Sequence, residues 1–256
     1  MRILLVGDIV GRAGRRAVVT LVPRLRRELS LDYVIANAEN AAAGRGTTLK
    51  IVRELLEAEV DVLTGGNHSW AVDAFHETLD GDLPVLRPAN YPSGAPGRGI
   101  WSDDRLTVMN LIGRTFMQPL DDPFAGIDRL LEELPGAQPV VVDFHAEATS
   151  EKQAFGWHVD GRVAGVVGTH THVATADTRL LPNGTAFVTD LGMCGARDAI
   201  IGSEVAPVLK RFRTGLPTRL PPETKGPVLF SSALIEIDET TSRAVGIERV
   251  DRLLEA

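Results

Sequence analysis

A regular alternation of short apolar runs and helical patterns near the start of the chain constrains its fold most strongly. Apolar runs over residues 2–8, 32–38 and 60–64 are rich in β-branched residues, which is typical of buried strands. A helical repeat of apolar residues follows the first run, and Thr48 can cap a second amphipathic helix before the third. The order strand, helix, strand, helix, strand predicts an α/β layer protein.

Further strands are predicted over residues 106–112, 139–144, 163–167 and 185–190. The segments 230–237 and 244–249 alternate more strictly and lie close together, which favours a hairpin at the edge of a sheet. We therefore expect a layered α/β fold with mixed sheets. The sequence shows no internal repeat and no convincing linker, so one domain over residues 1–256 is expected.

Three local features interrupt the regular pattern of strands and helices. Pro23 lies inside the first helical pattern, which predicts a kink or two short helices. Residues 84–87 are a candidate fourth strand, and a Gly/Pro-rich loop follows them. Residues 214–227 are rich in proline, glycine and charge, which indicates a surface loop.

Charge and cysteine content exclude several classes of protein. With 27 basic and 34 acidic residues the net charge is −7, which argues against nucleic acid or anionic lipid as the main partner. The single cysteine, Cys194, excludes an internal disulfide framework and a multi-cysteine zinc site. The sequence contains no signal-peptide pattern and no apolar run of membrane-spanning length. We expect a soluble, cytoplasmic protein.

Five of the predicted strands end in side chains that can bind a metal ion. These residues are Asp8, Glu39, Asn67 with His68, His145, and His170 with His172. In open α/β sheets, ligands gather at the carboxyl ends of the strands, so these residues converge if the strands share a sheet. His170 and His172 would point the same way on an extended backbone. Each residue alone can be a helix cap or a loop residue, but the repeated position favours a common site.

The chemistry of this set suits a metal pair. Carboxylate, amide and imidazole groups without thiolate favour Mn²⁺, Fe or Zn²⁺. Seven candidate ligands exceed the needs of one ion, so two ions roughly 3.5–4 Å apart fit better. Such a pair lowers the pKa of a bridging water and clamps the oxygens of a phosphoryl group.

These motifs resemble those of the calcineurin-like metallophosphoesterases. The sequences GDIVGRAG, NAENAAAG, GGNHSW, RPANYP, FHAEATSEK and GTHTHVATAD are most similar to the YmdB-like branch of that superfamily, from Arg2 to about Gly202. Val10 stands where the wider superfamily has a histidine, and Glu39 follows Ala38 where it has Gly-Asp. Both departures are features of the branch, in which Asn40 supplies the missing ligand. The resemblance implies an α/β/β/α sandwich with mixed sheets.

The resemblance also implies roles for individual residues. One metal ion would be bound by Asp8, Glu39, Asn40 and His172. The second would be bound by Glu39, Asn67, His145 and His170, so that Glu39 bridges the two. Fe or Mn is the expected metal, with Zn as an alternative, and His68 would donate a proton to the leaving oxygen after attack by a metal-bridging hydroxide. The implied activity is hydrolysis of phosphodiesters, with 2′,3′- and/or 3′,5′-cyclic nucleotides as substrates.

Three other residues are candidates for substrate binding. Arg12 follows Asp8 closely and can hold a phosphate, although a solvated helix start explains it equally well. Asn90 and Tyr91, in the Gly/Pro-rich loop, can line the mouth of the site. We expect a small phosphodiester as partner, no membrane, no stable binding of nucleic acid, and a homo-oligomer as a possible assembly.

The sequence lacks the motifs of several other classes of enzyme. The spacing of Gly7, Gly11 and Gly14 does not fit a dinucleotide-binding loop, and the sequence has neither a P-loop nor a G-x-S-x-G elbow. The alternative to catalysis is a metal-binding regulatory protein that acts through partner contacts. His68 beside the candidate ligands favours catalysis, because a site that only binds metal has no use for a proton donor.

Overall fold

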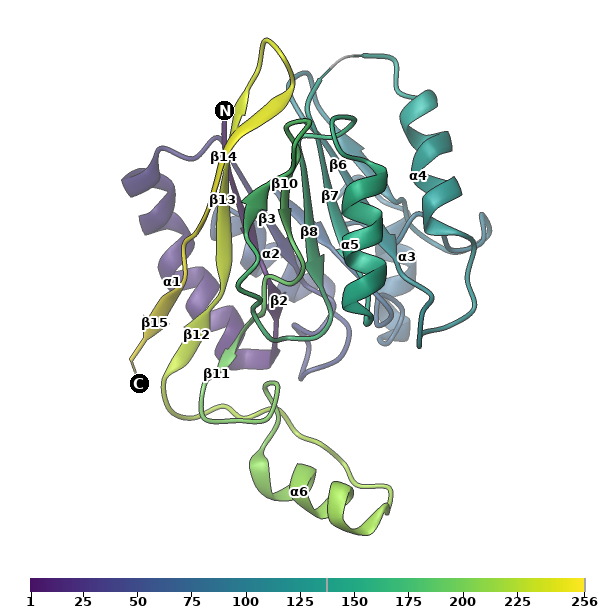
Figure 1. Ribbon diagram of the computed structural model, residues 1–256. Coiled ribbons are helices and arrows are strands. Elements are labelled where there is room, and N and C mark those ends of the chain that lie inside the picture. The colour runs from purple at the N-terminus through teal and green to yellow at the C-terminus, as the bar shows by residue number, and fades with distance from the viewer. Residues whose placement is uncertain (137, 256) are drawn as a thin grey trace.

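Three mixed sheets form the framework of the computed structural model, which describes residues 1–136 and 138–255 (Figure 1). The five-stranded sheet has the order β14 (Arg243–Arg249), β13 (Ser232–Asp238), β1 (Arg2–Val6), β3 (Tyr33–Asn37), β4 (Val62–Thr64). The six-stranded sheet has the order β5 (Ile100–Ser102), β6 (Thr107–Ile112), β7 (Val140–His145), β8 (Gly165–Thr169), β10 (Ala186–Val188), β9 (Arg179–Leu180). A small sheet has the order β15 (Arg252–Leu254), β12 (Val228–Phe230), β11 (Met193–Ala196), β2 (Asp8–Ile9).

The strands that end in candidate metal ligands are parallel to one another within each large sheet. β1, β3 and β4 run parallel to one another, and so do β6, β7, β8 and β10. The remaining strands of these sheets are antiparallel, including the edge hairpin of β13 and β14. The predicted mixed sheets and the predicted terminal hairpin are therefore confirmed.

Helices cover the outer faces of the two large sheets. They are α1 (Gly11–Leu29), α2 (Leu49–Glu57), the 3₁₀ turn η1 (Asp73–Phe75), α3 (His76–Leu79), α4 (Pro123–Glu132) and α5 (Thr149–His158), whereas α6 (Val205–Thr214) lies apart from the sheets (Figure 1). Figure 1 shows α1 on one side of the sheets and α4 and α5 on the other.

Alternation along β1 shows how the layers are packed. Leu4 and Val6 lie in a core shared with α1 and α2, while Ile3 and Leu5 lie in a core shared with the six-stranded sheet. A third core joins the outer face of that sheet to α4 and α5, where the rings of Phe144 and Phe155 stack 4.1 Å apart. Since successive residues of a strand point to opposite faces, these three cores define four layers. The α/β/β/α sandwich is confirmed.

Helix α1 runs through Pro23 without interruption, so the alternative of two short helices is wrong. Its buried face continues on both sides of the proline, with Val18, Leu21, Val22 and Leu25 all in the core. Proline removes one hydrogen bond and crowds the preceding turn. Packing of a continuous apolar stripe offsets that cost here.

Two other helices begin where side chains cap them. The Thr48 hydroxyl accepts a hydrogen bond from the backbone N–H of Ile51 at the start of α2, as the sequence indicates. Asp122 accepts from the N–H of Phe124, and Pro123 occupies the first turn of α4.

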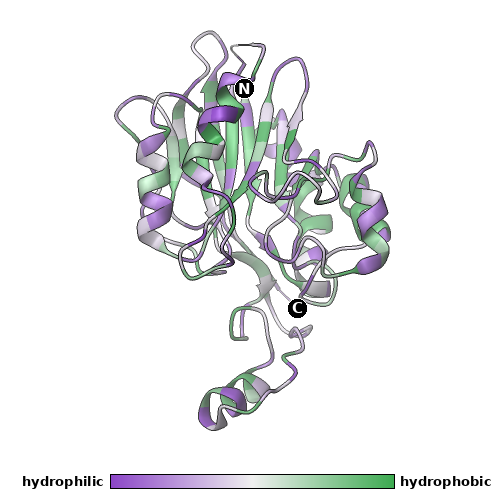
Figure 2. Cartoon of the chain, turned by 90° about the vertical axis from the view of Figure 1, so that its right-hand side faces the viewer, coloured by the Kyte–Doolittle hydropathy of each residue, from purple (hydrophilic) through white to green (hydrophobic). Residues whose placement is uncertain are grey.

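Two predictions for the loops need correction. Residues 84–87 do not form a strand: Val85 and Leu86 make only isolated bridges, to Leu63 and Arg98. The chain between β11 and β12 contains α6, which the sequence did not lead us to expect, and the loop expected over residues 214–227 follows it. Figure 2 shows α6 projecting away from the layered body.

No helix in the described part of the chain is both long and apolar enough to cross a membrane. The single domain over residues 1–256 stays a prediction.

Candidate metal centre

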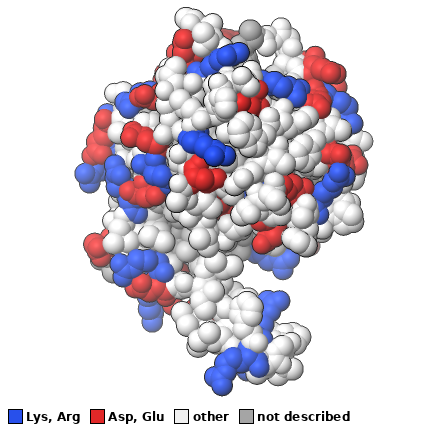
Figure 3. Space-filling view, viewed as in Figure 1, with Lys and Arg blue, Asp and Glu red and all other residues white. Residues whose placement is uncertain are grey.

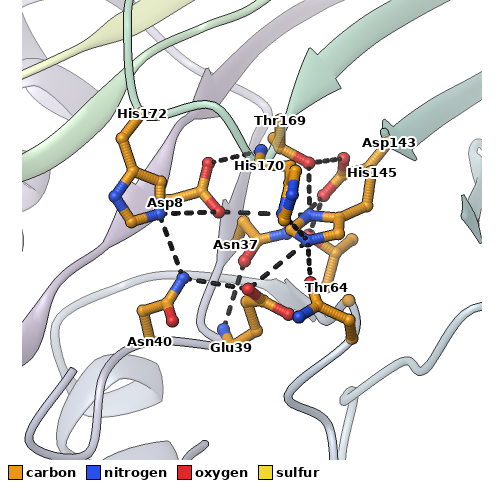
Figure 4. A network of polar contacts seen from close by, with 12 residues as sticks. Asp8, Asn37, Glu39, Asn40, Thr64, Asp143, His145, Thr169, His170 and His172 are labelled. Carbon is orange, nitrogen blue, oxygen red and sulfur yellow. Dashed lines mark hydrogen bonds and ion pairs between the residues drawn. The ribbon is translucent and has the colours of Figure 1, made fainter. Parts of the chain in front are cut away.

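The polar strand ends come together, but not through a shared sheet. β3 and β4 lie in the five-stranded sheet, β7 and β8 in the six-stranded sheet, and Asp8 begins β2 of the small sheet. The two large sheets share an apolar core. Polar side chains from the carboxyl ends of β3, β7 and β8 point toward one another and toward Asp8 (Figure 4). The premise of one common sheet is therefore wrong, although the convergence itself occurs.

The centre of the cluster contains ligand atoms from three strand ends. One ligand atom from each of Glu39, His145 and His170 lies within 4.8 Å of the others. His145 Nε2 is 3.3 Å from Glu39 Oε1, 2.9 Å from Asn67 Oδ1 and 3.1 Å from His170 Nδ1. Four predicted ligands thus surround one point.

A second group lies on the other side of Glu39. Asn40 Nδ2 is 3.0 Å from Glu39 Oε1 and 3.2 Å from His172 Nε2, and His172 Nε2 is 3.7 Å from Asp8 Oδ1. A half-turn of the Asn40 amide would bring its oxygen to this position, because the two amide atoms are interchangeable in shape. Glu39 is the residue common to both groups.

Each of the three histidines directs one ring nitrogen into the centre and the other to an acceptor. Outside the centre, His145 Nδ1 is 2.9 Å from the Thr169 hydroxyl, and His170 Nε2 is 3.1 Å from a carboxylate oxygen of Glu147. His172 Nδ1 is 3.0 Å from the carbonyl of Ile201. Metal-binding histidines show this arrangement, because the outer acceptor fixes the ring and its tautomer.

Asp143 positions the His145 ring through the hydroxyl of Thr169. The Thr169 hydroxyl that contacts His145 is 2.6 Å from Asp143 Oδ1, and Thr64 and Asn37 donate to the other oxygen of the same carboxylate. Burial raises the pKa of Asp143. The carboxylate therefore anchors β3, β4, β7 and the end of β8 to one another.

The charges and unpaired atoms of the centre indicate whether its residues fit a cation. Asp8 is fully buried, burial raises its pKa to about 6, and its Oδ1 atom has no hydrogen-bond partner among the described residues. Burial disfavours the charged forms of Glu39 and His145, but their mutual attraction outweighs it, so the pKa of Glu39 is lowered and that of His145 is raised. Burial and the neighbouring His145 lower the pKa of His170 to about 3, which leaves its ring neutral. Orphaned carboxylate oxygen and neutral imidazole are the groups that divalent ions bind, so the residues fit a metal centre.

Comparison with known proteins assigns the chain to a family. A family model described as YmdB-like protein matches residues 4–250. The chain is 48% identical to a 2′,3′-cyclic-nucleotide 2′-phosphodiesterase of Bacillus subtilis, over 98% of this chain and 96% of that protein. The chain belongs to the YmdB-like family.

Solved structures agree with this assignment. A hypothetical protein from Thermus thermophilus matches with a TM-score of 0.94 and 43% identity over 100% of both chains. A novel phosphatase from Mycoplasma pneumoniae matches with a TM-score of 0.93 and 30% identity over 100% of this chain and 94% of its own. The family resemblance read from the sequence motifs is confirmed.

The two histidines of the GTHTH motif of this YmdB-like chain do not lie on an extended backbone. β8 ends at Thr169, and both His170 (φ 96°) and His172 (φ 65°) adopt left-handed conformations. The expectation of an extended His-x-His is therefore wrong. Tertiary hydrogen bonds hold this conformation, since the N–H of His170 donates to Asp8 Oδ2 at 3.0 Å.

Sequence reasoning missed a buried ion pair that holds the same loop. Lys152 Nζ lies 2.6 Å from Asp190 Oδ2, and each side chain is only 1% exposed. Asp190 also accepts hydrogen bonds from the backbone and hydroxyl of Thr171, between the two histidines. Lys152 falls in the FHAEATSEK motif and Asp190 ends a predicted strand, but nothing in the sequence links them.

Gly66 brings the chain close to the centre. A Cβ atom at this position would lie 2.3 Å from Glu39 Oε2 and 2.4 Å from His145 Nε2. Only glycine leaves these two ligands in place. The glycine pair in the Gly-Gly-Asn-His sequence is the sequence feature that indicates this close approach of the backbone.

His68 lies at the open side of the centre, half-buried. Its backbone N–H donates to Glu39 Oε2 at 2.9 Å, and Arg45 Nε donates to its ring Nδ1 at 3.3 Å. Burial holds the pKa of His68 below its usual value, although Glu39 acts in the opposite direction. The sequence analysis did not predict a role for Arg45. The glycines around it in AAAGRG are the one sequence feature that could have indicated it.

Two hollows open onto the metal centre from solvent. A cavity of about 580 Å³ is bounded by Glu39, His68 and His172 on one side and by residues 201–222 on the other. A second hollow, of about 400 Å³, lies between His68, His170 and residues 116–118. Phe116 in its wall is 89% exposed and has a φ of 62°.

The predicted substrate residues Arg12, Asn90 and Tyr91 line neither of these hollows. Arg12 is exposed on α1. Asn90 is buried and bridges Ile112 and Asp121 through hydrogen bonds, and Tyr91 contacts the ring of Trp70. Substrate binding by these residues stays a prediction, and for Asn90 the structure shows a bridging contact within the protein.

Proposed function

We propose that this chain is a metal-dependent phosphodiesterase that hydrolyses the cyclic phosphate of 2′,3′-cyclic nucleotides. The observation that carries the proposal is a cluster of buried carboxylate and imidazole groups at the floor of a 580 Å³ cavity, with one buried carboxylate oxygen that has no hydrogen-bond partner among the described residues. That volume lies within the range of about 300–1,000 Å³ typical of small-ligand sites. The name of the Bacillus subtilis relative supports the choice of substrate. We also propose activity on 3′,5′-cyclic nucleotides, which the same experiment tests.

Two metal ions, Fe or Mn with Zn as an alternative, fit the two groups of ligands. The proposed ligands are Asp8, Glu39, Asn40 and His172 for one ion, and Glu39, Asn67, His145 and His170 for the other. The proximity of Glu39 Oε1 to both Asn40 and His145 supports a bridging role for Glu39. When bound, such ions supply Lewis acidity to the phosphoryl oxygens and lower the pKa of water.

The protein's own groups at the open side suit the rest of the reaction. In 2′,3′-cyclic phosphate hydrolysis, water oxygen bonds to phosphorus, the bond from phosphorus to O2′ breaks, and O2′ takes up a proton. We propose that His68 supplies that proton and that Arg45 holds the phosphate oxygens; the contact between Arg45 and the His68 ring at the open side of the centre supports both roles. An anionic phosphate next to the ring would raise the lowered pKa of His68 and so favour its protonated form.

The exposed ring of Phe116 offers a surface for the base. Its exposure, its left-handed backbone and its place in the wall of the second hollow support this role. Stacking on an aromatic ring is worth about 1–3 kcal/mol per base and tolerates any base.

The test is hydrolysis of adenosine 2′,3′-cyclic phosphate and adenosine 3′,5′-cyclic phosphate by the protein loaded with Mn²⁺ or Fe²⁺. We expect adenosine 3′-phosphate as the product of the first substrate. His68→Ala should lower kcat by about 10²–10⁴-fold while metal content is unchanged.

His158→Ala is the matched control, because His158 contacts Asp128 on the surface, away from the centre. Equal rates for the wild type and His68→Ala would refute the assignment of the proton donor. Loss of activity in both histidine variants would point to a general effect on the fold.

One observation favours a second function, metal-dependent regulation through partner contacts. Helix α6 presents Val205, Leu209 and Phe212 to solvent, and Phe212 is 82% exposed. A metal-loaded protein that hydrolyses no phosphodiester would support this reading over catalysis.

A further inference from the structure

A basic arm forms the wall of the cavity opposite the metal centre. We call residues 203–222 the α6 arm; it contains α6 and projects from the layered body (Figure 2). Two backbone hydrogen bonds of 2.9 Å close its base, from Glu204 N to Pro221 O and from Glu223 N to Gly202 O. The adjacent carbonyl of Ile201 contacts His172 Nδ1 at 3.0 Å, so the base of the arm is tied to a predicted metal ligand.

The α6 arm carries a local charge opposite to that of the whole chain. Its basic residues are Lys210, Arg211, Arg213 and Arg219, and its one acidic residue is Glu204, at the base. Figure 3 shows Lys and Arg side chains gathered on this projecting lobe. Since the chain as a whole has a net charge of −7, the arm is a distinct basic surface.

Two of these arginines reach the cavity of the metal centre. Arg211 and Arg219 line it together with Arg45, whereas Arg213 does not. The guanidinium groups of Arg211 and Arg219 have no hydrogen bond or ion pair within residues 1–136 and 138–255. Glu39, on the cavity floor, is the sole acidic residue in the described lining. The mouth of the cavity therefore offers positive charge that the protein itself does not neutralise.

This charge exceeds what a cyclic mononucleotide requires. A 2′,3′-cyclic phosphate carries one negative charge, and the metal centre with Arg45 already faces it. Guanidinium groups bind phosphate oxygens through paired hydrogen bonds, so further arginines suit a further phosphate. On a nucleotide whose 2′ and 3′ oxygens are in the cyclic ester, the ribose position left for a phosphate is the 5′ oxygen.

We propose that Arg211 and Arg219 select substrates that carry a phosphate on the 5′ oxygen of the nucleotide being hydrolysed. This inference rests on the proposed function. The phosphate can be terminal, as in a 5′-phosphorylated cyclic nucleotide, or internal, as at the 3′ end of an oligoribonucleotide. Both sources share the chemistry that the arm recognises.

The experiment compares three substrates at fixed ionic strength. They are adenosine 2′,3′-cyclic phosphate, its 5′-phosphorylated form, and a uridylyl-adenosine dinucleotide ending in the same cyclic phosphate. Because one charge-assisted contact to phosphate is worth about tenfold in affinity, we expect kcat/KM to be about 10–100-fold higher for a substrate with the 5′ phosphate. The gain should lie in KM and should weaken as salt concentration rises.

The double variant Arg211→Gln with Arg219→Gln should reduce this preference to about one. Arg213→Gln removes the same charge from the same helix outside the cavity, and it should keep the wild-type preference. Preference for the dinucleotide alone would identify the internal phosphate as the ligand, and preference for both substrates would identify the 5′ phosphate itself.

The two proposals fail in different ways. If the wild type hydrolyses adenosine 2′,3′-cyclic phosphate with the same kcat/KM as its 5′-phosphorylated forms, the arm has no selective role and this inference is overturned, while the proposed function stands. A preference that survives in the double variant also overturns it. If the metal-loaded wild type hydrolyses none of the three substrates, the proposed function itself is wrong.

Discussion

Replacing Lys152 by methionine removes one half of a buried ion pair. The ammonium group of Lys152 and the carboxylate of Asp190 are 2.6 Å apart, and both side chains are 1% exposed. Methionine fills a similar volume without charge, so the main effect is a buried carboxylate without its cation. Breaking such a pair costs about 3–5 kcal/mol.

The surroundings of Asp190 determine where in this range the cost falls. Its carboxylate keeps three other hydrogen bonds, two from Thr171 and one from the N–H of Gly192 at 2.7 Å. These contacts stabilise the residual charge, so we expect about 3 kcal/mol. For a chain of this size that corresponds to a fall in Tm of about 6–12 °C.

The assay is equilibrium unfolding in urea, with chelator present so that metal binding does not contribute. Lys152→Met combined with Asp190→Asn should recover part of the loss, giving a coupling free energy of about 1–3 kcal/mol in a double-mutant cycle. Arg24→Met is the control, because it breaks an exposed pair with Glu28 on α1 and should leave the free energy of unfolding nearly unchanged. A loss of less than about 1 kcal/mol for Lys152→Met would refute the argument that this pair is desolvated and structurally required.

Three further outcomes are expected. Gly66→Ala would place a Cβ 2.3 Å from Glu39 Oε2, so metal affinity measured by calorimetry should fall about 10–100-fold. In the control variant Gly126→Ala, the new Cβ meets no atom nearer than 3.7 Å, so this variant should retain the wild-type metal affinity. Burial raises the pKa of Asp177, but hydrogen bonds from two threonines outweigh it and hold the pKa below its ordinary value. Asp177→Asn should therefore destabilise the protein in urea above pH about 4, with the difference vanishing as pH falls through the lower folded pKa; a difference that persists at low pH would contradict this. Removing bound metal should lower Tm, because ligand at about 1,000 times its Kd contributes about 4 kcal/mol to the folded state, and an unchanged Tm would show that no ion binds.

The layers and the identity of the central residues could be predicted from sequence because both depend on local patterns. Short β-branched runs define the strands, and a polar residue after each run marks its carboxyl end. The same reasoning placed Glu39, His145 and His170 near one another, although two sheets rather than one bring them together. A strand pattern specifies that a segment is buried, but it does not specify which sheet it joins.

Other features depend on contacts between distant residues. The sequence Thr-His-Thr-His favours an extended backbone locally, yet hydrogen bonds from this loop to Asp8 and Asp190 hold His170 and His172 at positive φ. The pairing of Lys152 with Asp190 joins residues 38 positions apart, and no local signal connects them. Only the fold itself reveals such contacts.

Helix α6 escaped prediction for a different reason. Pro207 falls within it, and its apolar residues such as Leu209 and Phe212 face solvent instead of a core. A periodicity argument assumes that an apolar face is buried, and here most of that face is not.

The most direct test of the account is the number of metal ions that the protein binds. Elemental analysis after reconstitution with Mn²⁺ or Fe²⁺ should give about two ions per chain for the wild type. Asn40→Ala and Asn67→Ala should each retain about one ion, because each asparagine contacts one of the two groups, while Glu39→Gln should weaken both sites. A wild-type protein that binds no ion under these conditions would contradict the convergence of these residues on a metal centre.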